Sequence, residues 1–187
     1  MKQIEKSEVF SIPNIMGYFR ILLIPVFVWV YCTAETTTDY YIAAAVIGLS
    51  GLTDLFDGMI ARKFNMVTEL GKFVDPLADK LTQFALVVCL TTRFKLMWLL
   101  IVLFVVKESF MSIMGVVMIK KYNKKLDGAM WFGKVCTAVL YIVMFVLLLI
   151  PSLSITIANV LIGVCAIVIL ATLLLYIPVF IKMGKGE

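Results

Sequence analysis

Four aspartates with regular spacing stand out in this sequence as residues that could do chemistry. The segment from Asp54 to Asp79 reads DLFDGMIARKFNMVTELGKFVDPLAD. At about 100° per residue on a helix, Asp54 and Asp57 share one face, and Asp75 and Asp79 share one face of the next helix. The connection between the helices is short, so they must run antiparallel with these faces able to meet. The spacing therefore predicts four converging carboxylates.

Converging carboxylates repel one another unless cations compensate them. Oxygen-rich sites suit hard divalent cations, and Mg²⁺ binds proteins through a few carboxylates together with substrate phosphates. We therefore predict a site for Mg²⁺ or Mn²⁺, with two ions able to clamp a pyrophosphate as its bond breaks. Gly58 and Gly71 would let the phosphate-bearing ligand approach the backbone closely, and Arg62 could neutralise phosphate oxygens with its forked guanidinium.

A purely structural role is the alternative interpretation of these acids. Aspartates often cap helices or pair with nearby basic residues, which in this segment are Arg62, Lys63, Lys72 and Lys80. Such a role would account for one or two acids. Four acids at this spacing favour the metal site.

The composition indicates the elements that must position these acids. The chain has 187 residues, of which 63% are hydrophobic and 16% are charged, and its mean hydropathy is +1.05. The segment Val135–Ile181 contains no Asp, Glu, Lys or Arg over 47 residues. That length is enough for two membrane spans of about 20 residues each. The sequence thus predicts an integral membrane protein.

The hydrophobic pattern predicts an all-α membrane protein with six transmembrane helices. The expected spans are 13–33, 39–60, 70–92, 96–119, 131–150 and 155–180. We expect one membrane-embedded catalytic domain over residues 1–187, in which residues 1–12 form a short cytoplasmic segment. The second and third spans each have a charged half, and ionisable residues at membrane depth are costly unless they have a function.

The net charge of +5 could indicate nucleic-acid binding, but the placement of the basic residues favours another explanation. They gather near the ends of the spans, at Lys2 and Lys6, Arg62 and Lys63, Lys120 to Lys125, and Lys182 and Lys185. Excess Lys and Arg beside spans marks the cytoplasmic side. Arg93 and Lys95, in a short outer turn, are the exceptions. We therefore expect no nucleic-acid partner and place both termini and the acids on the cytoplasmic side.

The aspartate pattern D-x2-D-G-x2-A-R-x8-G-x3-D-x3-D resembles the signature of the CDP-alcohol phosphatidyltransferase family. The resemblance implies a six-helix membrane fold, a homodimer, and a site open to the cytoplasm, here of a bacterial inner or plasma membrane. It implies that Asp54, Asp57, Asp75 and Asp79 bind the metals. Asp79 would also be the general base for the acceptor hydroxyl, and the chain has no histidine to take that role.

The resemblance also implies the lipid donor and its contacts. The donor would be CDP-diacylglycerol, drawn from the membrane lipid, and Gly58, Arg62 and Thr68 stand where family members contact it. The opening Ile12-Pro13-Asn14, with Arg20 and Pro25, is similar to that of phosphatidylglycerophosphate synthases. Asn14 is therefore a candidate donor contact, with a helix-start cap as the alternative. Gly17 stands where the family often has threonine.

Two lysines are candidates for binding an acceptor phosphate. Lys107–Glu108 and Gly133-Lys134 resemble segments of phosphatidylglycerophosphate synthases, where Arg–Glu is usual at the first. Glycerol 3-phosphate is a dianion, which Lys107 and Lys134 could bind. The alternative for Lys107 is an ion pair with Glu108 or a site aspartate.

The predicted reaction transfers a phosphatidyl group from CDP-diacylglycerol to glycerol 3-phosphate and releases CMP. Three alternatives stay open. The acceptor could be phosphatidylglycerol, as in cardiolipin synthases, which share the Asp75-Pro76-Leu77-Ala78-Asp79-Lys80 segment. The acids could instead serve a divalent-cation carrier or channel, since ion pathways also place acids in membranes. A structural membrane subunit is the third, but it has no need of four converging acids.

Overall fold

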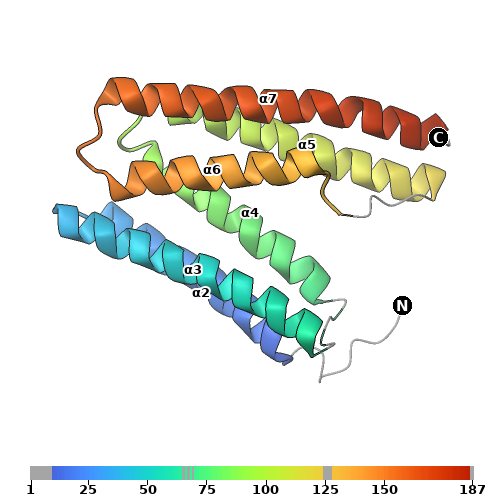
Figure 1. The fold of residues 1–187 in the computed structure, drawn as a ribbon, viewed down its shortest axis with the longest axis horizontal. Coiled ribbons are helices and arrows are strands. Elements are labelled where there is room, and N and C mark those ends of the chain that lie inside the picture. The colour runs from blue at the N-terminus through green and yellow to red at the C-terminus, as the bar shows by residue number, and fades with distance from the viewer. Residues whose placement is uncertain (1–9, 65, 67, 69, 124–127, 186–187) are drawn as a thin grey trace. The chain divides into compact units, whose positions relative to one another are not determined.

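A computed structural model describes residues 10–64, 66, 68, 70–123 and 128–185 of the chain. This described part forms six long helices and contains no strand (Figure 1). The helices are α2 (Ile12–Cys32), α3 (Thr37–Lys63), α4 (Gly71–Leu90), α5 (Met97–Tyr122), α6 (Trp131–Leu149) and α7 (Ile155–Lys185). The predicted all-α class with six helices is confirmed, and each expected span falls on one of these helices.

Five of the six helices are long and apolar enough to cross a membrane. The exception is α4, which has 20 residues but carries Lys72, Asp75, Asp79 and Lys80 in its first half. Within a span, a helix satisfies its own backbone hydrogen bonds, which the bilayer interior demands. The chain is therefore a multi-pass membrane protein, and the crossing of the bilayer by α4 stays a prediction.

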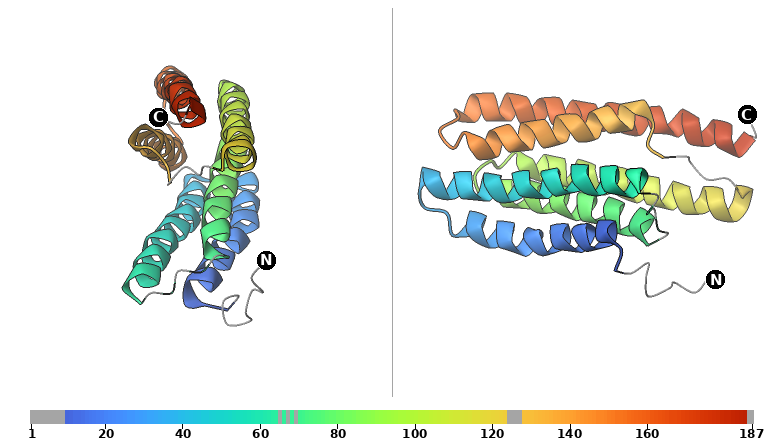
Figure 2. Two further views of the ribbon diagram at one scale, coloured as in Figure 1. Left: turned by 90° about the vertical axis from the view of Figure 1, so that its right-hand side faces the viewer. Right: turned by 60° about the horizontal axis from the view of Figure 1, so that its bottom comes forward.

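The chain forms two compact units, one up to Cys89 and the other from Leu90 onward. The expectation of a single catalytic domain stays a prediction. In the first unit α2 packs along α3, with Phe27 and Ala43 fully buried (Figures 1 and 2). A capping box starts α3: the Thr36 hydroxyl accepts a hydrogen bond from the Asp39 N–H, and the Asp39 carboxylate accepts one from the Thr36 N–H. The two reciprocal bonds satisfy donors that a helix start leaves unpaired.

In the second unit α7 packs against both α5 and α6. Aromatic rings fill the contact, and those of Phe132 and Tyr176 lie edge to face with their centroids 4.7 Å apart. The Tyr176 hydroxyl also accepts a hydrogen bond from the N–H of Met130, at the N-cap of α6. At the other end of α6, the Arg93 guanidinium donates a 2.6 Å hydrogen bond to the Pro151 carbonyl. These contacts hold both ends of α6.

Candidate active site

An arginine on α2 lies at the centre of the candidate site. Arg20 is the single charged residue of α2, and its side chain is only 3% exposed. Its guanidinium forms ion pairs with three of the four signature aspartates, on two other helices. The partners are Asp54 and Asp57 of α3, the latter at 2.9 Å, and Asp75 of α4 at 3.2 Å. A buried charge needs such partners, because an unpaired one is very costly.

The three paired carboxylates differ in their exposure. Asp57 is 4% exposed, whereas Asp54 is 51% and Asp75 is 44% exposed. Asp57 Oδ2 contacts the guanidinium but has no hydrogen-bond partner within the part of the chain that is described. Asp54 and Asp75 keep carboxylate surface open for a ligand.

The charge balance of this cluster fits a divalent cation. Three carboxylates carry three negative charges and one guanidinium carries one positive charge, which leaves two negative charges. Oxygen donors of this type are those that Mg²⁺ and Mn²⁺ prefer. The described residues do not, however, form a ready-made cage of three or more metal-ligating side chains. The donor set fits a metal, and the metal site stays a prediction.

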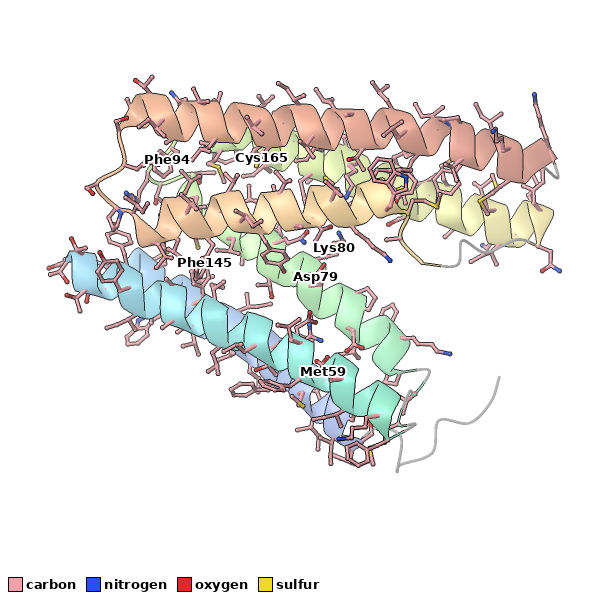
Figure 3. All side chains as sticks on the ribbon, in the orientation of Figure 1. Met59, Asp79, Lys80, Phe94, Phe145 and Cys165 are labelled. Carbon is pink, nitrogen blue, oxygen red and sulfur yellow. The ribbon has the colours of Figure 1, made fainter. Side chains whose placement is uncertain are left out.

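Asp79, the fourth signature aspartate, lies on α4 (Figure 3). It follows Asp75 by one helical turn. Its carboxylate accepts a long hydrogen bond of 3.4 Å from the Gln83 side-chain amide, one turn further along. Because Asp75 and Asp79 are four residues apart, they share a face of α4. The proposed role of Asp79 as a base therefore rests on the family pattern and on the face of α4 that it shares with Asp75.

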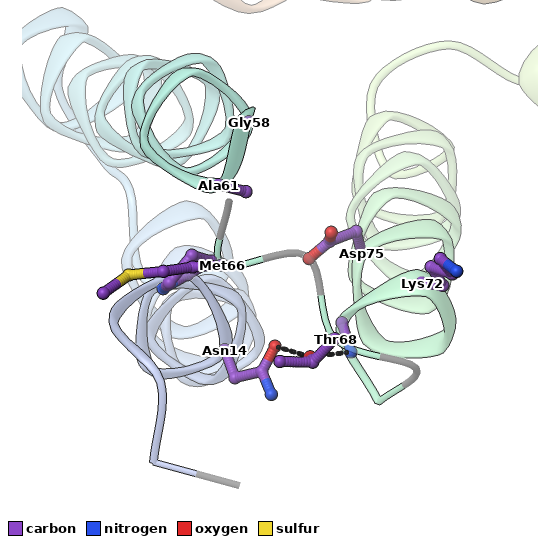
Figure 4. Close-up of a pocket in the computed structure, with 9 residues that line it drawn as sticks. Asn14, Gly58, Ala61, Met66, Thr68, Lys72 and Asp75 are labelled. Atoms are coloured by element: carbon purple, nitrogen blue, oxygen red, sulfur yellow. Dashed lines mark hydrogen bonds between the residues drawn. The ribbon is translucent and has the colours of Figure 1, made fainter. Parts of the chain in front are cut away.

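Arg20 and its partners Asp54, Asp57 and Asp75 are called the arginine cluster below. A pocket opens beside this cluster, within the first unit. It is lined by residues of α2, α3 and α4 and of the segment before α4, and Asp75 belongs both to it and to the cluster. In Figure 4 the Asp75 carboxylate points toward the space between the helices. The lining residues are Pro13, Asn14, Gly58, Ala61, Met66, Thr68, Gly71, Lys72 and Asp75. The structure thus brings together four of the five residues predicted to contact the donor.

Hydrogen bonds among three of these residues shape one wall of the pocket. The Thr68 hydroxyl donates to Asn14 Oδ1 at 3.1 Å and accepts from the Gly71 N–H at 2.9 Å (Figure 4). A Cβ on Gly71 would come within 2.7 Å of Asn14 Oδ1. A side chain at this position would have to displace the Asn14 amide, so Gly71 serves a contact within the protein. The N-cap of α2 is Ser11, so Asn14 does not have the alternative role of a cap.

The other predicted site residues lie elsewhere or outside the description. Arg62 lies on α3, but its side chain is outside the described part of the structure. Lys107 and Lys134 lie in the second unit. Lys107 is 7% exposed and forms a 2.7 Å ion pair with Glu108, as its alternative interpretation anticipated. Lys134 is exposed in the first turn of α6.

Sequence reasoning missed the role of Arg20. It was noted only as part of the opening motif, although a lone arginine within an apolar span is itself a signal of an internal partner. The contribution of Gly17 was also missed. A Cβ at Gly17 would come within 2.9 Å of Val74 Cγ1 and 3.4 Å of Asp75 Oδ1. Glycine here leaves room for the side chains of Val74 and Asp75 of α4 beside the arginine cluster.

Comparisons with known proteins show the family of this chain. Residues 10–181 match the family model described as CDP-alcohol phosphatidyltransferase. A protein of Escherichia coli strain K12, named CDP-diacylglycerol–glycerol-3-phosphate 3-phosphatidyltransferase, is 30% identical over 171 residues, which cover 90% of this chain and 93% of that protein. A protein of Shigella flexneri serotype 5b with the same name is 32% identical over 130 residues, or 68% of this chain and 71% of its own length.

Proposed function

The chain belongs to the CDP-alcohol phosphatidyltransferase family, and from this premise we propose that it transfers a phosphatidyl group from CDP-diacylglycerol to glycerol 3-phosphate, with release of CMP. The main support is the junction of the arginine cluster with the pocket at Asp75. There, carboxylates suited to a divalent cation adjoin a cavity lined by four of the five residues predicted to contact the donor.

The proposed mechanism gives each residue a limited task. Mg²⁺ or Mn²⁺, held by Asp54, Asp57, Asp75 and Asp79, would neutralise the charge of the donor pyrophosphate when bound. The acceptor hydroxyl attacks the β-phosphorus, a new phosphorus–oxygen bond forms, and the bond to CMP breaks. Asp79 takes the proton of the attacking hydroxyl, which is too weak an acid to ionise alone.

The pocket wall would hold the nucleotide part of the donor. Asn14 and Thr68 present polar groups there, and Gly58 leaves the backbone of α3 open to the ligand. Arg62, of the same signature, would pair with phosphate oxygens. The assignments of Asn14, Thr68 and Gly58 rest on the family pattern and on their shared lining of one pocket. That of Arg62 rests on the family pattern alone.

The acceptor is the finer part of the proposal. Relatives named for glycerol 3-phosphate cover nearly the whole chain, which favours that acceptor over the phosphatidylglycerol of a cardiolipin synthase. Lys107 and Lys134 are the residues proposed to bind its phosphate. Lys107 is paired with Glu108, so it would contribute its charge only if it binds the phosphate beside that carboxylate or exchanges partners.

A direct assay tests the reaction. Purified protein in detergent is supplied with CDP-diacylglycerol and, in separate reactions, with glycerol 3-phosphate, phosphatidylglycerol, inositol phosphate or serine, and CMP release is measured. We expect rapid release with glycerol 3-phosphate, loss of activity in excess EDTA, and recovery with Mg²⁺ or Mn²⁺. Preference for phosphatidylglycerol would move the protein to the cardiolipin synthases, and full turnover in EDTA would exclude a metal role.

Lysine substitutions test the acceptor site. We expect Lys107→Ala or Lys134→Ala to raise the KM for glycerol 3-phosphate by about tenfold or more, the usual effect of losing a hydrogen bond to a charged group. The KM for CDP-diacylglycerol should change little. Lys120→Ala is the matched control, because Lys120 is an exposed lysine at the end of α5, and its kinetics should stay close to those of the wild type. Unchanged KM values in both test variants would remove these lysines from the acceptor site.

Sidedness and assembly complete the proposal. Basic residues beside the spans favour a cytoplasmic site and cytoplasmic termini in a bacterial cell membrane. We expect a cysteine at exposed Phe64, in a background without the four native cysteines, to react with an impermeant thiol reagent only in inverted vesicles or lysed cells. A cysteine at exposed Glu35, in the loop before α3, should react in intact cells. The reverse labelling pattern would mean that the topology is inverted.

The family resemblance also supports a homodimer, which light scattering in detergent would detect.

A further inference from the structure

The position of Arg20 relative to the aspartates has a consequence for metal binding. The guanidinium nitrogens contact carboxylate oxygens of Asp54, Asp57 and Asp75. These three carboxyl groups are also among the ligands proposed for the divalent cation. A carboxylate oxygen that points at a guanidinium cannot bind a metal ion in the same direction.

The burial of Arg20 makes this contact strong. Its side chain is 3% exposed and that of Asp57 is 4% exposed, so solvent screens their attraction much less than at a surface. Arginine is also charged at every relevant pH. The guanidinium is therefore a permanent positive charge among the proposed metal ligands, whereas a metal ion can bind and dissociate.

The packing of α2 along α3, together with side-chain contacts from α4, keeps Arg20 in this place. Gly17 lies one turn before Arg20 on the same helix, and the absence of a side chain there lets α2 approach Val74 and Asp75. The Asn14–Thr68 hydrogen bond ties the start of α2 to the segment that leads into α4. Arg20 is thus held beside the aspartates by the packing of α2 along α3 and by side-chain contacts of α2 with α4 and with the segment before it.

We propose that Arg20 is an internal counter-ion that competes with the divalent cation for Asp54, Asp57 and Asp75 and thereby sets the metal affinity of the site. This inference rests on the metal site of the proposed function. Arg20 keeps the acids of α3 and α4 together when no metal is bound, and a metal ion binds at the expense of these ion pairs. Arg20 is in this sense a positioning residue.

Metal binding measured without substrate tests this role. The Kd for Mn²⁺ is measured by calorimetry on the full chain in detergent, after treatment with EDTA and its removal. We expect Arg20→Gln to bind Mn²⁺ at least about tenfold more tightly than the wild type, because one unit positive charge no longer opposes the ion. Arg20→Lys keeps the charge but loses the fork that bridges the acids, so its Kd should lie between the two.

Arg93→Gln is the matched control. Arg93 is also a partly buried arginine, but it donates hydrogen bonds to backbone carbonyls, those of Leu147 and Pro151, and lies outside the candidate site. Its substitution should leave the Kd for Mn²⁺ unchanged.

If Arg20→Gln folds poorly, its thermal stability with and without Mn²⁺ tests the inference instead. Repulsion among the acids should lower the Tm of metal-free Arg20→Gln below that of the wild type, and Mn²⁺ should raise it by more than it raises the wild-type Tm. If this variant does not fold even with Mn²⁺, the Kd of Arg20→Lys decides, and a value no lower than the wild-type value overturns the inference.

The outcomes separate this inference from the proposed function. Absence of Mn²⁺ binding in the wild type and in Arg93→Gln would overturn the metal site and the inference with it. Normal binding in those two proteins, with equal or weaker binding in Arg20→Gln, would overturn only the competition by Arg20.

Discussion

Asp57→Asn should lower kcat/KM by about 100-fold or more, the usual scale for losing one group that stabilises charge in a transition state. Asp57 is the most deeply buried of the three paired acids, so water cannot easily replace its charge. The variant should also need more Mg²⁺ or Mn²⁺ for half-maximal rate, because one proposed ligand has lost its negative charge. Steady-state CMP release over a metal titration measures both effects.

The same substitution elsewhere on α3 provides the control. Asp39 lies in the first turn of the helix and belongs to its capping box, far along the chain from the arginine cluster. Asp39→Asn should retain a rate and a metal dependence close to those of the wild type. If Asp57→Asn behaved like Asp39→Asn, Asp57 would have only a structural pairing with Arg20.

Asp79→Asn should lower kcat by about 100-fold or more, the usual contribution of a general base. Asparagine keeps the size and one oxygen of aspartate but cannot accept the proton of the attacking hydroxyl. CDP-diacylglycerol should still bind, since Asp54, Asp57 and Asp75 keep their carboxylates. A thermal shift induced by CDP-diacylglycerol in the presence of Mg²⁺ measures donor binding separately from rate.

The pH profile distinguishes a base from a ligand at this position. If Asp79→Asn turned over at nearly the wild-type rate across about pH 6 to 9, Asp79 could not be the base. The proton would then leave through water or through the acceptor phosphate. Loss of the donor-induced thermal shift in this variant would instead mean that Asp79 is needed to bind the metal and donor.

Much of the fold could be predicted from the sequence, because a membrane span can be recognised from the hydrophobicity of its own residues. A run such as Val135–Ile181 without charged residues has few stable arrangements other than membrane helices, whatever the rest of the chain does. The helix α4 is the harder case. Its charged first half departs from the hydropathy of a span, and its expected crossing was inferred from its apolar second half.

The acids of the candidate site were also predictable, since helix periodicity alone places Asp54 with Asp57 and Asp75 with Asp79. Their spacing further carries the family signature, and the family is confirmed. Periodicity states which residues share a face of one helix. It does not state how far each helix is rotated about its axis, nor which residue of another helix faces it.

Only the tertiary structure, therefore, placed Arg20 among the acids, since its partners Asp54 and Asp75 lie 34 and 55 residues away in the sequence. The contact from Thr68 to Asn14 likewise spans 54 residues. Both contacts depend on where α2 lies relative to the segments that follow it. Gly17 and Gly71 stand at these contacts. Their lack of a side chain matters only because a neighbouring segment lies beside them. Local spacing identified the acids of the site, and helix packing placed the Arg20 guanidinium against three of them.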